Sequence, residues 1–96
     1  MHIIILRFTA EKAHAGAFMA AHNAWLQQGF DDGIFLMSGG LVPGLGGVIL
    51  AHGSSAAEIH ARVAVDPFVI EGIVTAEISE VTPGRLDERL SFLRAA

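Results

Sequence analysis

The 96-residue sequence has no cysteine, and it has only six lysine and arginine residues against ten aspartate and glutamate residues. The absence of cysteine excludes disulfide bonds, thiolate catalysis and cysteine-based metal sites. A net charge of −4 without a basic cluster argues against nucleic acid or an anionic membrane surface as a partner. The apolar run of residues 3–6 is too short for a membrane span or a signal-peptide core, and Arg7 follows it at once. We therefore expect a cytoplasmic protein.

What the sequence does have is a large apolar fraction, 52% of its residues. The length fits a single domain, and a domain of this size buries only a little over ~60% of the surface that its unfolded chain exposes. An apolar excess in so short a chain suggests that a second subunit covers part of its surface. The sequence therefore predicts a homodimer or a higher homo-oligomer.

Hydrophobic periodicity predicts two helices. The first is expected over residues 10–28, with Thr9 as its N-cap and Gly29 as the left-handed residue that ends it. The second follows the capping box of Ser55 and Glu58 and ends before Pro67, since the residue before a proline disfavours the helical region.

Four segments have the composition or alternation of strands, namely residues 2–8, 33–38, 48–52 and 73–81. The glycine-rich residues 39–47 connect the second and third as an antiparallel hairpin. The order is β-α-β-β-α-β, which predicts an α+β, ferredoxin-like fold with an antiparallel sheet and both helices on one face. We expect this domain over residues 1–83, followed by a short helical tail over residues 84–96 with a stripe of Leu86, Leu90 and Leu93 that packs either on the sheet or on a second subunit.

His22 and Asp66 are the best lead to function. His22 lies four residues after Phe18 and four before Leu26, so a helix would carry it on the face that packs on the sheet. A buried imidazole needs a hydrogen-bond partner, and a carboxylate that orients it would make it a general base or acid. The alternative is structural: a core histidine bonded to a backbone carbonyl, with Asp66 as the N-cap of a short helix that has Pro67 at its first position.

Other candidates carry weaker signals. Arg7 could hold an anionic substrate group or pair with a nearby carboxylate, and the second interpretation is favoured. His14 and His22 would stand ~12 Å apart along one helix, and the remaining histidines lack metal-ligand spacing, so we expect no metal. Residues 39–47 lead into a strand rather than a helix, which argues against a phosphate-binding loop.

Three motifs occur in order along the chain: His22 followed four residues later by Leu26, a glycine at the end of the predicted second strand (Gly39), and Asp66-Pro67-Phe68 followed by Gly72. In these motifs the chain resembles the YCII-related (YciI-like) family of the dimeric α/β-barrel superfamily over residues 1 to about 83. Family members often have proline where this chain has Gly40, and an aromatic residue in the second helix where this chain offers Ile59, His60 and Arg62.

The resemblance implies sheet-to-sheet dimerisation and a His–Asp active site in a cleft between helices and sheet. One relative is a dehydrochlorinase that acts on a chlorinated hydroxyquinol, and the muconolactone isomerases share the fold. Our hypothesis is a small, cofactor-independent lyase or isomerase with His22 and Asp66 as catalytic residues, acting on a small ring that bears a carbonyl or hydroxyl. Arg7, Ser38, Gly39 and Phe68 are the predicted substrate-binding residues. The alternatives are a non-catalytic ligand-binding or accessory dimer and, third, a cofactor-free quinone-forming monooxygenase.

Overall fold

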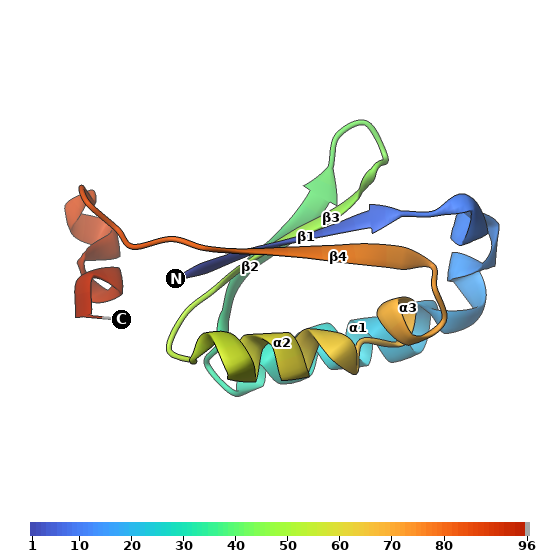
Figure 1. The fold of residues 1–96 in the computed structure, drawn as a ribbon, viewed down its shortest axis with the longest axis horizontal. Helices are drawn as coiled ribbons and strands as arrows, with labels where there is room; N and C mark the ends of the chain where they lie inside the picture. The colour runs from blue at the N-terminus through green and yellow to red at the C-terminus, as the bar shows by residue number, and fades with distance from the viewer. Residues whose placement is uncertain (96) are drawn as a thin grey trace.

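The structure is a computed structural model that describes residues 1–95, so the last residue of the predicted tail lies outside the described part. Its sheet has four antiparallel strands in the order β2-β3-β1-β4. Figure 1 shows all three α-helices on one face of this sheet. The chain therefore has the predicted α+β, ferredoxin-like fold. In chain order the elements are β1 (His2–Phe8), the 3₁₀ helix η1 (Ala10–His14), α1 (Ala15–Asp31), β2 (Phe35–Leu41), β3 (Gly46–Ala51), α2 (Ala56–Ala64), α3 (Pro67–Ile70), β4 (Val74–Glu80) and the 3₁₀ helix η2 (Glu88–Ala95).

Local sequence signals explain where most helices begin. The Thr9 hydroxyl accepts a hydrogen bond from the backbone N–H of Glu11 at the start of η1. At α2 the capping box is complete, because the Ser55 hydroxyl accepts from the N–H of Glu58 and the Glu58 carboxylate accepts from the N–H of Ser55. The hydrogen bond from the Ser55 backbone N–H and, second, the one from the Ser55 side chain to the Glu58 carboxylate hold the pKa of Glu58 below its ordinary value of 4.5.

The predicted end of the first helix was wrong. The helix continues to Asp31, and Gly33, with φ of +73°, takes the left-handed conformation that was expected of Gly29. Gly29 lies within the helix because Phe35 packs against its backbone, and a Cβ atom there would come within 2.1 Å of the Phe35 ring. Tertiary packing, not helix termination, requires a glycine at this position.

The two faces of the sheet differ in what covers them. The face under the helices carries the core, which includes Ile4, Leu6 and Ile49, each at most 3% exposed. The other face carries half-buried Ile3, Ile5, Val48 and Leu50, and nothing in the described chain forms a helical layer over it. We call the face that holds these four residues the open face. Met37 belongs to this face through its pairing with Leu50 and is 45% exposed.

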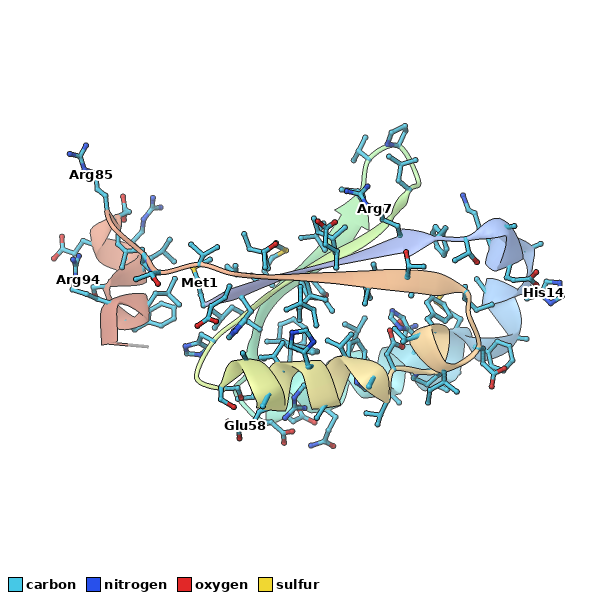
Figure 2. All side chains as sticks on the ribbon, in the orientation of Figure 1. Met1, Arg7, His14, Glu58, Arg85 and Arg94 are labelled. Atoms are coloured by element: carbon cyan, nitrogen blue, oxygen red, sulfur yellow. The ribbon has the colours of Figure 1, made fainter. Side chains whose placement is uncertain are left out.

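The C-terminal segment is helical, as predicted, but forms a 3₁₀ helix rather than an α-helix. Figure 1 shows it at one end of the molecule, beyond the N-terminus and away from the helical layer, and Figure 2 shows Arg85 and Arg94 pointing away from the rest of the chain there. The Phe92 ring meets the His52 ring edge to face at a centroid distance of 5.4 Å. Leu93 is 1% exposed, whereas Leu90 is 41% exposed, so the leucine stripe is only partly covered.

Candidate active site

α1 and α3 bring His22 and Asp66 together. The Nδ1 atom of His22 lies 2.7 Å from the Oδ1 atom of Asp66, which is a hydrogen bond across 44 residues of sequence. Both residues are buried, Asp66 fully and His22 to 9% exposure. A carboxylate accepts only, so Nδ1 carries the proton of this hydrogen bond. In the neutral imidazole, Nε2 is then the basic nitrogen.

Asp66 also has the structural role that its sequence context predicts. Its Oδ1 atom accepts a second hydrogen bond, of 3.0 Å, from the backbone N–H of Phe68 and thereby caps α3. The turn and the imidazole do not bond to different oxygens of the Asp66 carboxylate. Oδ1 accepts both hydrogen bonds, and Oδ2 is buried without a hydrogen-bond partner among the described residues. Burying a carboxylate oxygen without a hydrogen bond costs free energy. The hydrogen bond from the His22 imidazole to Oδ1 offsets part of this cost.

Aromatic rings fix the plane of the His22 imidazole. The Phe68 ring stacks on it at a centroid distance of 4.0 Å and an interplanar angle of 6°. The Trp25 ring lies 5.7 Å from it at 30°, and the Trp25 indole N–H donates a 3.0 Å hydrogen bond to the carbonyl of Arg62 in α2. Stacking therefore restricts the rotation of the imidazole, and the side-chain hydrogen bonds within residues 1–95 include that of Nδ1 to Asp66 but none of the Nε2 atom.

An ion pair and a hydrogen bond connect α1 and α2 behind the site. The Arg62 guanidinium in α2 forms a 3.0 Å ion pair with Asp32, the C-cap residue of α1. Hydrogen bonds from the Gln28 amide and from Arg62 lower the pKa of the exposed Asp32 carboxyl. This pair and the Trp25–Arg62 hydrogen bond fix α1, and hence His22, relative to α2.

Two adjoining cavities between helix and sheet reach the imidazole. The first has a volume of about 200 Å³ and the second about 220 Å³. Both are lined by Leu6, His22, Gly39 and Gly47. Apolar side chains form most of the remaining walls, including Phe8 and Phe68 in the first cavity and Leu26 and Ile49 in the second. The His22 ring therefore opens onto a small, mainly apolar space, while Asp66 lies behind it and lines neither cavity.

Three of the four predicted substrate-binding residues line these cavities. Gly39 lines both, Phe68 the first and Ser38 the second. Arg7 does not, because its partners in the sheet, Gly46 and Thr75, place it on the open face, with its guanidinium 3.9 Å from the Glu77 carboxylate. This position matches the carboxylate pairing that was favoured for Arg7 and removes it from the His22 cavity.

The other histidines lie outside the site. His14 and His60 are exposed, and His52 contacts the carbonyl of Gly33 at 3.1 Å. His2, the first residue of β1, is buried to 3% exposure because it alternates with Ile4 on the helix-facing side of the strand. Within the described residues, no group of three or more histidine, aspartate or glutamate side chains could hold a metal ion.

Some residues that line the cavities were missed from sequence. Met19 and Asn23 line the first cavity together with His22, and their positions within one turn of His22 on the same helix could have indicated a shared region. Gly47 was expected only as part of a turn. Its role becomes visible only from the strand register, which sets Gly47 between Gly40 of β2 and Leu6 of β1.

Comparison with known proteins places this geometry in a family. No curated protein matches the chain significantly. Among solved structures, the chain is similar to 5-chloro-2-hydroxyhydroquinone dehydrochlorinase from Burkholderia phenoliruptrix AC1100, solved in complex with 2,5-dihydroxybenzoquinone. The two share 20% sequence identity and a TM-score of 0.71, over 88% of this chain and 96% of the other, which shows a common fold.

No helix within residues 1–95 is long and apolar enough to cross a membrane. The model of the YCII-related domain matches residues 1–83, and the chain therefore belongs to this family.

Proposed function

We propose that this protein is a small enzyme of the lyase or isomerase type that uses His22 as its general base and acid without a cofactor. One observation carries the proposal: the Asp66 carboxylate holds Nδ1 of His22 at 2.7 Å, while the ring lines two cavities large enough for a small molecule. A positioned imidazole can take a proton from a substrate hydroxyl or an acidic C–H and return it elsewhere.

Three side chains have separate roles in the proposed reaction. His22 transfers the proton through Nε2. Asp66 orients the ring and stabilises its positive charge after protonation, since a carboxylate hydrogen bond favours the charged imidazole. Phe68 stacks on the ring and excludes water from that side. In an isomerisation the proton returns to another substrate atom; in an elimination it leaves through His22 while a leaving group departs with its electron pair.

The cavities favour a substrate of about one ring. Each is smaller than the ~300–1,000 Å³ that is typical of sites for drug-sized ligands. Their walls are mainly apolar, with polar groups at His22, Asn23 and Ser38. A single ring with carbonyl or hydroxyl groups meets both conditions. The dehydrochlorinase of the same fold is named for such a substrate, a chlorinated hydroxyhydroquinone.

A non-catalytic binding domain is the second candidate. It is favoured by the fact that Asp66 already has a sufficient structural role as the cap of α3. In that case His22 would serve to satisfy the buried carboxylate, and the cavities would bind a ligand without transforming it.

The His22→Asn variant separates the two candidates. An asparagine amide can still donate to Asp66 but has no second nitrogen at the position of Nε2. With 5-chloro-2-hydroxyhydroquinone as the first substrate and chloride release as the readout, we expect His22→Asn to lower kcat by roughly 10²–10⁴-fold. His60→Asn, which changes an exposed histidine of α2, is the matched control and should leave kcat unchanged.

The same variant can refute the catalytic role. If any turnover found for the wild-type protein, on this or another one-ring hydroxy or oxo compound, survives in His22→Asn, His22 is not the base. Binding of the one-ring compound 2,5-dihydroxybenzoquinone without turnover of any such compound would favour the binding domain.

We also propose that two copies pair through their open faces. Half-buried Ile3, Ile5, Val48 and Leu50 form an apolar centre there. The Arg7–Glu77 ion pair lies at its margin, where polar groups surround many interfaces. An Ile5→Asp substitution places a charge in this centre, and sedimentation velocity should show a shift from dimer to monomer. A wild-type mass of one chain at micromolar concentration would contradict the proposal.

A further inference from the structure

The first cavity offers a substrate one polar side chain besides His22. Asn23, the next residue of α1, lines this cavity, and the other side chains that line it within the described part of the chain are apolar. Asn23 is exposed, whereas His22 is buried to 9% exposure, so the amide lies where the cavity meets solvent and the imidazole lies deeper. Met19, one turn before Asn23 on the same helix face, lines the cavity too. A ring in this cavity can therefore meet two polar side chains, one deep and one at the edge.

The Asn23 amide is not engaged by the protein. Two other amides of α1 bind carboxylates one turn further along the chain. Gln27 donates to Asp31 at 2.9 Å, and Gln28 donates to Asp32 at 2.7 Å. The side-chain hydrogen bonds within residues 1–95 include these two but none of Asn23. Its N–H groups can therefore donate to a carbonyl oxygen of a ligand, and its carbonyl can accept from a hydroxyl.

The stability of α1 does not explain an asparagine at position 23. This position lies in the middle of the helix, far from both caps, among the alanines at positions 20, 21 and 24. Asparagine is one of the weaker helix formers, and alanine or leucine would suit the helix better. The amide thus weakens the helix without giving the fold a hydrogen bond, which is the usual sign of a residue that serves binding rather than stability.

We propose that Asn23 binds one oxygen of the substrate ring in the first cavity while Nε2 of His22 acts on another, so that the site takes rings with at least two oxygen substituents. This inference rests on the proposed function, because it adds a second contact to the same substrate. A ring held by a single hydrogen bond can still turn in its plane, whereas two hydrogen bonds fix which ring position faces Nε2. The aromatic walls Phe8 and Phe68 favour the first cavity for a flat ring, since the apolar side chains of the second are aliphatic.

Two substitutions at position 23 separate a hydrogen bond from a wall contact. Asn23→Leu keeps nearly the volume of the side chain and removes only its polar groups, whereas Asn23→Ala removes both. Both residues are good helix formers, so each variant should keep or raise the urea midpoint. Gln27→Leu is the matched control, because it makes the same change one turn along α1 at a residue that lines neither cavity.

The experiment titrates 2,5-dihydroxybenzoquinone, a ring with several oxygen substituents, into the wild type, into these three variants and into Ser38→Ala of the second cavity. Isothermal titration calorimetry gives Kd, and NMR follows the side-chain amide of Asn23 and the backbone amide of His22. We expect both signals to shift in the wild type. Asn23→Ala and Asn23→Leu should each raise Kd by about three- to tenfold, because one hydrogen bond to the ring is lost. Gln27→Leu and Ser38→Ala should leave Kd unchanged.

Each other outcome overturns a different claim. If the quinone shifts His22 and binds both Asn23 variants as tightly as the wild type, the Asn23 contact is wrong while the acid–base proposal stands. A higher Kd in Asn23→Ala alone would show that residue 23 only fills the wall, and a higher Kd in Ser38→Ala alone would place the ring in the second cavity; either result overturns the contact. If the quinone shifts no resonance of His22, the one-ring substrate class is wrong and the contact fails with it.

Discussion

Two glycines of α1 should respond in opposite directions to the same substitution. Alanine is favoured over glycine within a helix by up to about 1 kcal/mol. A Cβ atom at Gly16 would have no heavy atom within 4 Å, so Gly16→Ala should raise the free energy of unfolding by a few tenths to about 1 kcal/mol. At Gly29 the same methyl group would come within 2.1, 2.2 and 2.7 Å of three atoms of the Phe35 ring.

The Phe35 ring cannot yield easily. It is 3% exposed, and the Trp25 and Phe30 rings meet it edge to face at centroid distances of 5.3 and 6.1 Å. Overfilling a packed core costs roughly 1–3 kcal/mol, and a clash with a confined ring belongs at the upper end of that range. After subtraction of the helix gain, we expect Gly29→Ala to lower the free energy of unfolding by about 2 kcal/mol. For a domain of this size, that lowers Tm by roughly 8–16 °C.

Urea denaturation followed by circular dichroism measures both variants, at one protein concentration because oligomerisation changes apparent stability. The combination Gly29→Ala with Phe35→Leu should recover part of the loss, since the smaller side chain makes room for the methyl group. If Gly29→Ala is as stable as Gly16→Ala, the close packing of α1 on Phe35 is wrong.

Two further predictions concern the carboxylates that cap helices. Asp66→Asn should be far more stable than Asp66→Ala, because asparagine still caps α3 and accepts from His22, while alanine gives up both hydrogen bonds and costs about 3 kcal/mol or more; equal urea midpoints would contradict this. Ser55→Ala should raise the pKa of Glu58 only part of the way toward 4.5, as measured by carboxyl ¹³C NMR titration, since alanine keeps the backbone N–H that is the largest cause of the shift and loses the side-chain hydrogen bond that is the second. Because this pKa is depressed in the folded state, the stabilisation by Glu58 is complete above pH 4.5 and is lost as the pH falls through the depressed value. An unchanged Glu58 titration in Ser55→Ala would show that the Ser55 side chain does not contribute to the shift.

The element order could be predicted from sequence because the signals are local. The capping box at Ser55 and Glu58, the cap at Thr9 and the proline at position 67 each specify their own turn of chain. The end of α1 could not be predicted in this way. Gly29 and Gly33 are both plausible left-handed residues from sequence, and only the distant Phe35 ring determines that Gly29 stays within the helix.

The candidate site was predictable in its polar residues and not in its empty space. His22 stood out because it is polar on an apolar helix face, and Asp66 because it precedes proline and an aromatic residue. The position of Arg7 depends on strand parity, since neighbouring residues of a strand point to opposite faces and a single step changes the face. The position of Gly47 between Gly40 and Leu6 depends on how β1, β2 and β3 pair, including the bulge between Phe35 and Met37, which no local signal specifies.

Empty space beside the dyad is the strongest argument for a functional rather than a purely structural pair. Protein interiors contain few voids larger than a water molecule, because unfilled space forfeits packing energy. A His–Asp pair that served only to cap α3 would be satisfied in a filled core, with a larger residue at the position of Gly47. Here Gly47 lines both cavities beside His22 and has no positive φ that would require a glycine, so the space next to the imidazole stays unfilled from the side of the sheet. Retaining space at that position costs stability, which a binding site for a ring would explain and a structural pair would not.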